Sequence, residues 1–286
     1  MDSLLNETLA DLLAKTWNMA AWLVGLAVFF VPLEFFCAAT PKKVFRKGLL
    51  IDLGYYFLNG LALASLLSIP MSFVAIAVQR WIPAALLEAT ADLNVWTKIV
   101  VGFLISETGY YWGHRLSHQV PFLWRFHAIH HSAEQLDFLV NTRAHPVDMV
   151  FSRFMALAPM YLLGFGNKGK ISISGNLVPL VVTLVPAVWG FFIHANLKWR
   201  FGPLEWLFST PAFHHWHHTK SGPINRNFSS NLPWLDALFG TLYLPKELPT
   251  DYGIDSPVPD KLIDQLLYPL APEVSLKETT TQEPTT

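Results

Sequence analysis

Hydrophobic residues are concentrated in four long runs separated by short polar stretches. These runs cover Trp17–Ala39, Leu49–Val78, Val95–Trp112 and Leu177–Ile193. A membrane-spanning helix needs about 20 predominantly apolar residues, and each run reaches or approaches that length. Helices satisfy all their backbone polar groups within one segment, as lipid requires. The pattern therefore predicts an all-α, polytopic membrane helical bundle.

The second run is longer than one perpendicular crossing requires. A helix of about 30 residues measures about 45 Å, whereas the hydrocarbon core is about 30 Å thick. We expect this run to tilt, to kink near Pro70 or to fold back. A weaker apolar segment, Val147–Phe165, is interrupted by Asp148 and Arg153, and we expect it either to cross or to form a re-entrant half. Four to six membrane-inserted helices are predicted in all.

The polar ends of the runs predict the topology. The first 17 residues carry three acids and one lysine, which is unlike a secretory signal and favours an amphipathic helix lying on the membrane. The positive-inside rule places the basic cluster after the first run in the cytoplasm, together with the segment around His114. This cluster comprises Lys42, Lys43, Arg46 and Lys47. The tail, residues 275–286, has too few apolar residues to fold.

Composition narrows the chemistry. The formal net charge is only −1 and 52% of the residues are hydrophobic, so no nucleic-acid surface is predicted. The lone cysteine, Cys37, excludes internal disulfides, zinc–thiolate clusters and cysteine-ligated iron–sulfur centres. The stretch GFGNKG at 164–169 matches a dinucleotide-binding motif, but no strand precedes it, and it is interpreted as a turn between membrane segments.

All eleven histidines fall between positions 114 and 218. In HRLSH, His114 and His118 are four residues apart and share one face of a helix. Glu107 and Tyr111 continue that polar stripe along the third apolar run. Polar stripes within membrane helices are costly and usually mark function.

Two further clusters have the pattern H-x-x-H-H. In HAIHH, the helical spacing of His127, His130 and His131 is expected to aim all three rings at one point. The third cluster follows Thr210 and Pro211, which are typical of an N-cap and a first helical position. It contributes His214, His217 and His218.

Eight clustered imidazoles exceed the needs of a single four-coordinate zinc, so two metal ions are predicted. His194 ends the last apolar run and is expected to be a further ligand, because an ionisable group at that depth needs a partner. His145 is an open candidate, since loop histidines are often merely solvated. His215 lies off the ligand face and is expected to be a surface residue or to support the ligands from outside.

The three clusters resemble the histidine boxes of the fatty acid hydroxylase superfamily, which includes sterol desaturases, sterol methyl oxidases and alkylglycerol monooxygenases. The resemblance is carried by HRLSH, HAIHH and HHWHH in that order, with TRAHP, FIHANL and NFSSNLPWLDALFGT. It implies a catalytic domain at residues 95–245, between membrane spans at 1–94 and a C-terminal extension at 246–286. The eight box histidines would be ligands, and His194 would match the family's additional histidine.

Members of this superfamily are integral membrane enzymes that use two non-haem iron ions and O2 to hydroxylate or desaturate a lipid. The resemblance therefore implies a lipid substrate and, because this chain shows no fold for a redox cofactor, a separate donor such as a cytochrome, a ferredoxin or a reductase. The boxes would form a cytoplasmic, histidine-rich helical cap. Sterol, ether lipid, fatty acyl and carotenoid substrates all stay open.

The sequence departs from the family pattern at Glu107, where many members carry aspartate, at His215, where arginine is common, and in the Trp-Asp pair, which is split as Trp234 and Asp236. Glu107 and Asp236 are candidates to orient ligand rings through their second nitrogens, and Tyr111 and Asn196 are further supporting candidates. Two rival functions stay open: a non-enzymatic metal-binding or pH-sensing membrane protein, and a membrane zinc hydrolase.

Overall fold

The computed structural model describes residues 2–41, 44–166 and 177–271, and in this part of the chain all regular elements are helices, without a strand. Its α-helices are α1 (Asp2–Phe36), α2 (Leu49–Trp81), α3 (Ala84–Ala91), α4 (Val95–Gln119), α5 (Pro121–His131), α6 (Pro146–Leu162), α7 (Leu177–His194), α8 (Pro211–His217), α9 (Pro233–Leu238) and α10 (Leu262–Leu267). Three 3-10 turns, η1 (Phe138–Thr142), η2 (Gly202–Trp206) and η3 (Tyr268–Leu270), complete the set.

Three of these helices are long and apolar enough to cross a membrane: Thr8–Phe36 within α1, the whole of α2, and the whole of α7. The predicted span Val95–Trp112 lies in α4 but is not among the three, and neither is α6. α4 carries polar residues of the site, which lower its mean hydropathy, whereas α6 has only 17 residues and is too short to be counted. The predicted all-helical membrane bundle is confirmed, with three candidate spans where the sequence predicted four to six inserted helices.

Two local expectations are corrected. The N-terminal residues do not form a separate surface helix, because α1 runs without interruption from Asp2 to Phe36. The second apolar run does not fold back, because α2 is a single 33-residue helix that contains Pro70. Some expectations concern positions outside the described residues, namely Lys42, Lys43, residues 167–169 of GFGNKG and the tail 275–286.

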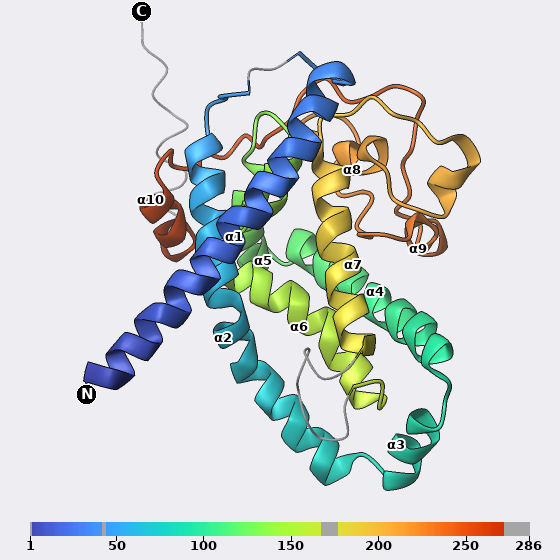
Figure 1. Cartoon of the computed structure of the whole chain (residues 1–286). Helices are drawn as coiled ribbons and strands as arrows, with labels where there is room; N and C mark the ends of the chain where they lie inside the picture. Colours follow the sequence, from blue (N-terminus) through green and yellow to red (C-terminus); the bar gives the residue numbers. More distant parts are fainter. Residues whose placement is uncertain (1, 42–43, 167–176, 272–286) are drawn as a thin grey trace, which may run out of the picture.

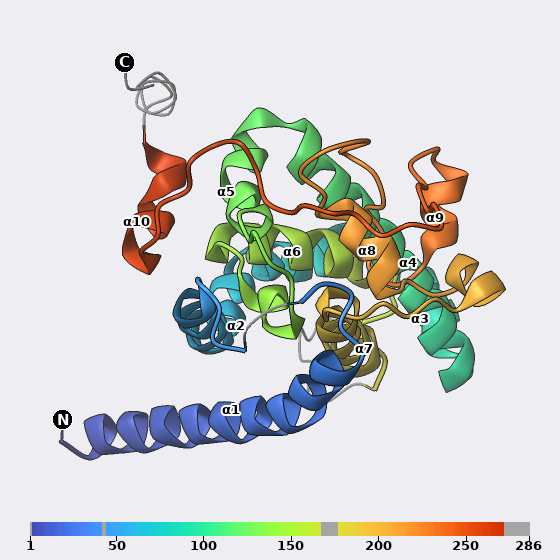
Figure 2. The same ribbon diagram turned by 90° about the horizontal axis from the view of Figure 1, so that it is seen from above.

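The candidate spans α1, α2 and α7 pack with helices that carry most of the histidines, and α7 itself ends at His194. α2 packs on α6, and α4 packs on α6, α7 and α5. Viewed from above, α1 runs along one edge next to α2 and α7, whereas α4, α5, α8 and α9 lie beyond them (Figures 1 and 2). The outward faces of the candidate spans expose large apolar side chains such as Phe29, Phe73 and Leu184. Exposed apolar surface of this extent fits contact with lipid.

Two glycines let α4 and α6 approach closely. A Cβ at Gly109 would lie 2.1 Å from the backbone oxygen of Met155, and one at Gly113 would lie 2.7 Å from the Met155 Cβ. Small residues four apart are a common device for close helix contact in membranes. This contact fixes the register between α4, which carries His114, and α6, which carries Asp148.

A buried ion network ties the start of α2 to the loop that follows α5. The Arg46 guanidinium donates to Asp52 at 2.5 Å and to Asp137 at 2.6 Å, and Arg143 donates to Asp52 as well. Arg46 is only 7% exposed, so it acts within the fold and not only as the topological signal that the sequence suggested. The network also fixes Arg143, whose carbonyl reaches the histidine site.

Candidate metal centre

Nine histidine rings from α4, α5, α7 and α8 gather into two adjacent groups. The first group comprises His114, His118, His127, His131 and His217, and the second comprises His130, His194, His214 and His218. Within each group, one nitrogen from every ring lies within 4.8 Å of the others. The groups touch, since the rings of His131 and His218 stack with centroids 4.4 Å apart. Rings far apart in the sequence thus meet at two centres.

Each H-x-x-H-H box is shared between the two groups, which corrects the expectation that its rings point at one spot. In α5, His127 and His131 face the first group and His130 faces the second. Consecutive helical residues point about 100° apart, so His130 must turn away from His131. The third box has the reverse arrangement, with His217 in the first group and both His214 and His218 in the second. Thr210 caps α8 as predicted, with Pro211 at its first turn.

The second group has nitrogen spacings that suit one metal ion. Nε2 of His194 lies 3.2 Å from Nε2 of His130, 2.9 Å from that of His214 and 3.3 Å from that of His218. With metal–nitrogen bonds of about 2.1 Å, neighbouring ligands are about 3.0 Å apart in an octahedron and about 3.4 Å apart in a tetrahedron. The four atoms therefore lie where ligands of a single ion would lie.

The first group holds buried nitrogens that lack a hydrogen-bond partner. Nε2 of His114 and Nε2 of His127 are 3.1 Å apart. Nε2 of His118, His131 and His217 are buried, and no partner for them is found in the described part of the chain. Several unpartnered buried acceptors at one point carry a large desolvation cost. A metal ion would satisfy them together, so these residues fit a metal.

The outer ring nitrogens explain which nitrogen is free to bind. Six Nδ1 atoms donate to oxygen acceptors: His114 to Phe228 O at 2.7 Å, His118 to Asn225 Oδ1 at 3.1 Å, His127 to Asp148 Oδ2 at 3.0 Å, His130 to Arg143 O at 2.9 Å, His194 to Gly190 O at 2.7 Å and His217 to Arg226 O at 2.8 Å. These oxygens can only accept, so each Nδ1 carries the proton and each Nε2 keeps its lone pair. Such outer bonds orient metal-binding imidazoles.

One short segment supplies three of these acceptors. Asn225, Arg226 and Phe228 hold three rings of the first group. Asn225 and Asn227 have φ values of 60° and 59°, a left-handed conformation that asparagine tolerates better than most residues. The Asn227 side chain fastens the segment by donating to Phe213 O at 2.8 Å and to Tyr243 O at 2.7 Å.

Glu107 and Asp236 support this segment and do not contact ligand rings, contrary to the expectation that they orient those rings directly. Asp236 accepts from the backbone N–H of Phe228 at 2.7 Å and of Ser229 at 2.9 Å. Glu107 accepts two hydrogen bonds from Asn231, at 2.8 and 3.0 Å. Both carboxylates therefore act one step further out, by fixing the backbone that holds the histidines.

Tyr111 and Asn196 also lie outside the two groups. The Tyr111 hydroxyl is 2.8 Å from Oγ1 of Thr241, and its ring packs edge-on against Phe228. The Asn196 side chain bonds the backbone of Thr40, which ties the end of α1 to the segment after α7. Both side chains therefore hold segments next to the site and are not among the clustered rings.

His145 is not part of either group. Its Nδ1 accepts from the Val147 N–H at 3.1 Å as the N-cap of α6, and its Nε2 lies 3.2 Å from Leu266 O. His215 is fully buried and bonds Ala195 O and the Tyr252 hydroxyl. Of the two alternatives for His215, the surface position is therefore wrong and the supporting position stays open, while its exclusion from the ligand set agrees with the two groups.

Sequence reasoning missed Asp148, which among the described residues is the one carboxylate that bonds a ring of the two histidine groups. Its Oδ1 also lies 3.5 Å from the Ser117 hydroxyl. The available signal was an aspartate inside the weak apolar segment at 147–165, where an unpaired charge is costly. The carbonyl acceptors had no sequence signal, because every residue has a carbonyl.

Burial keeps the histidines neutral. Desolvation, with the neighbouring His127 ring as the next cause, lowers the pKa of His114 to about 3 and that of His130 to about 4. Burial also lowers the pKa of His131, His217 and His218 well below the usual value. A neutral imidazole is the form that binds a metal, so these rings are ready to act as ligands at neutral pH.

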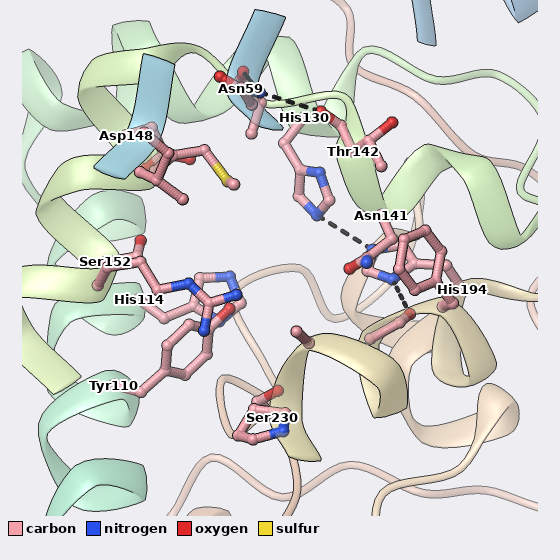
Figure 3. Close-up of a pocket in the computed structure, with 18 of the residues that line it drawn as sticks. Asn59, Tyr110, His114, His130, Asn141, Thr142, Asp148, Ser152, His194 and Ser230 are labelled. Carbon is pink, nitrogen blue, oxygen red and sulfur yellow. Dashed lines mark hydrogen bonds between the residues drawn. The ribbon is translucent and has the colours of Figure 1, made fainter. Parts of the chain in front are cut away.

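A cavity of about 300 Å³ opens from the two groups toward the membrane helices. Its lining includes His114, His130 and His194 together with Met19 of α1, Leu63 of α2 and Pro186 of α7. Figure 3 shows the labelled histidines facing the same open space as Tyr110 and Ser230. The cavity therefore connects the clustered nitrogens with apolar side chains from all three candidate spans.

The region that holds the site matches a known protein family. A family model described as "Fatty acid hydroxylase" matches residues 99–241, which is half of the chain. The matched region includes all nine clustered histidines, Asp148 and Asp236. No solved structure matches this chain.

Several characterised relatives share this region. An ornithine lipid hydroxylase of Rhizobium tropici is 39% identical over 181 residues, covering 61% of this chain and 50% of the relative. An alkylglycerol monooxygenase of Xenopus tropicalis is 31% identical, covering 65% and 39%. A methylsterol monooxygenase of Arabidopsis thaliana is 29% identical, covering 52% and 53%. The chain thus spans about half the length of these relatives or less.

Proposed function

The chain belongs to the fatty acid hydroxylase family, and we propose that it is a membrane-bound, O2-dependent di-iron oxidoreductase that hydroxylates or desaturates a lipid C–H bond. The observation that carries the proposal is the convergence of nine histidine nitrogens into two groups beside a cavity lined by membrane helices. The relatives named as lipid hydroxylases and monooxygenases support the same class of reaction.

The proposed ligands are the five rings of the first group for one ion and the four rings of the second group for the other. Neutral imidazoles suit iron. A pair of iron ions held there would supply the O2 chemistry that an unactivated C–H bond requires. Asp148 and the carbonyls of Phe228, Arg143, Gly190 and Arg226 hold the rings in place through their Nδ1 protons.

The rest of the site would orient the substrate and exclude water. Met19, Leu63 and Pro186 line the cavity with apolar surface from the candidate spans, so a lipid chain can enter without contact with water. Hydroxylation consumes one C–H bond, O2, two electrons and two protons and yields an alcohol and water. Desaturation consumes two C–H bonds with the same reagents and yields an alkene and two waters.

The two electrons come from outside the chain in this proposal, from a cytochrome, a ferredoxin or a reductase. The side of the membrane that carries the site is proposed to be the cytoplasm, as the positive-inside rule predicts.

The proposal is tested with protein purified in a mild detergent. We expect about two irons per chain, O2 uptake on addition of a chemical reductant and lipid extract, and a product heavier by one oxygen or lighter by two hydrogens. His130→Ala should lower the iron content and abolish O2 uptake. Zinc in place of iron, with lipid hydrolysis that persists without O2, would instead identify a hydrolase. Bound metal without any turnover would identify a metal-binding protein.

A further inference from the structure

Arg153 is a positive charge in the cavity that has no hydrogen-bond or ion-pair partner among the described residues. It lies on α6, is half-buried and lines the same cavity as His114 and His194. Within residues 2–41, 44–166 and 177–271, its guanidinium makes no hydrogen bond, and no carboxylate oxygen lies within 4.0 Å of it. A guanidinium removed from water without a compensating anion is costly. Folding alone therefore does not account for a charge at this position.

The neighbouring acids are engaged elsewhere. The groups that act electrostatically on Arg153 are Tyr110 and Glu107. Both carboxylate oxygens of Glu107 accept hydrogen bonds from Asn231. Asp148 also lines the cavity, but it bonds His127. Arg153 thus faces the cavity, and the Tyr110 hydroxyl in the same lining is a second donor.

The size of the cavity restricts what can reach Arg153. Its volume of about 300 Å³ is at the lower end of ligand pockets, which span about 300 to 1,000 Å³. Only part of a lipid fits. Apolar side chains of α1, α2 and α7 line the cavity together with polar ones that include Arg153, Ser152 and Tyr110. A head group with its adjoining carbons matches this mixed lining, and the charge of Arg153, better than the end of an acyl chain.

We propose that Arg153 binds the anionic head group of the lipid substrate, a carboxylate or a phosphate, so that the carbon presented to the histidine groups lies close to that head. A guanidinium pairs with either oxyanion through two parallel N–H···O bonds. The proposal builds on the function proposed above, because it names the class of lipid that the same cavity takes.

Binding is measured without turnover, so that it does not depend on activity. The purified full-length protein, in a neutral maltoside detergent, is kept under nitrogen without reductant and titrated with oleate, with oleoyl lysophosphatidate and with monoolein. These probes carry a carboxylate, a phosphate and a neutral head on the same acyl chain. We expect one or both anionic probes to bind at least about tenfold more tightly than monoolein, as a charge-assisted hydrogen bond of about 1.5–3 kcal/mol implies. Whichever anionic probe binds more tightly identifies the source of the oxyanion.

The variants separate recognition from folding. Arg153→Gln should weaken binding of the preferred anionic probe about ten- to hundredfold and leave monoolein unchanged, while Arg153→Lys should retain part of the selectivity. Arg80→Gln, which removes an exposed charge at the end of α2, is the matched control and should change nothing. Equal binding of all three probes to the unaltered protein would overturn the proposal even if Arg153→Gln failed to fold. A uniform loss of all three probes in Arg153→Gln would overturn it as well.

Failure of the head-group proposal can be distinguished from failure of the proposed function. Selective binding of an anionic lipid by a protein that consumes no O2 would leave the role of Arg153 standing and remove the oxygenase. Oxidation of a neutral lipid at a rate that Arg153→Gln does not alter would support the oxygenase and contradict the role proposed for Arg153. Fragmentation of the oxidised product should place the new oxygen or double bond near the anionic group, and a modification near the far end of the acyl chain would contradict this.

Discussion

The Asp148 carboxylate on α6 lies 3.0 Å from Nδ1 of His127 on α5. This bond is the one contact between a carboxylate and a ring of the two histidine groups in the described part of the chain. It gives His127 the tautomer with a free Nε2, and the negative charge would make that ring a stronger ligand for a metal ion bound there. α6 contributes no histidine to either group, yet it fixes the orientation of a ring on its neighbour.

Replacing Asp148 with asparagine is expected to weaken metal binding without unfolding the protein. An amide still fits the space but no longer supplies a charge, and such outer partners are typically worth about 10- to 100-fold in metal affinity or activity. Metal affinity is measured by competition with a chelator of known strength. Asp92→Asn, at an exposed helix end, is the control. Unchanged affinity in Asp148→Asn would show that the hydrogen bond does not tune the ligand.

The contrast between His194 and His145 tests the membership of the second group. His194→Ala removes a nitrogen that lies within 3.3 Å of three others, so the metal content should fall by about one ion per chain. His145→Ala removes the cap of α6 and the contact with Leu266 O. Loss of the cap should cost about 0.5–2 kcal/mol of stability, and the metal content should stay intact. Elemental analysis and thermal unfolding give the two readouts. Loss of metal in His145→Ala would place that residue in the site.

The contact between α4 and α6 predicts a steep steric effect. Gly109→Ala would place a methyl group 2.1 Å from a backbone oxygen, which cannot relax by a side-chain movement alone. We expect the free energy of unfolding to fall by about 1–3 kcal/mol and metal binding to weaken, because the two helices must move apart. Gly25→Ala on α1 is the control, since no atom lies within 4 Å of its added methyl. Equal melting temperatures for the two variants would contradict this account of the packing.

Acidification should release metal and destabilise the fold together. The pKa values of His114 and His130 in the folded chain, about 3 and about 4, lie below the usual 6.5. Between the pKa of each ring in the folded chain and 6.5, the unfolded chain binds more protons than the folded one. Stability therefore falls as the pH drops below about 6.5, by up to about 1.4 kcal/mol per pH unit for each such histidine.

Protons also compete with metal for each Nε2. Thermal unfolding and retained iron are measured from pH 8 to pH 5. We expect a plateau above about pH 7 and a joint decline below it. A stability that rises on acidification would contradict the burial of neutral rings.

Some of the fold could be predicted from particular residues. The helical positions of His114 and His118, and the N-cap at Thr210, follow from local spacing and local hydrogen bonding. The extent of α1 and the failure of α4 to qualify as an apolar span did not follow from the apolar runs alone. Run boundaries record hydropathy, whereas helix ends depend on where backbone hydrogen bonds stop.

The sequence by itself determined the composition of the site: imidazoles at helical spacing, no thiols, and enough apolar length for several membrane helices. Only the tertiary structure decided how nine of those rings divide between two groups, and that His145 belongs to neither. It also decided that Asp148 bonds a ring of the first group while Asp236 and Glu107 hold the backbone next to the two groups. The physical reason is that a helix fixes the angle between its own side chains, whereas the partner that each ring meets depends on the packing of segments distant in the sequence.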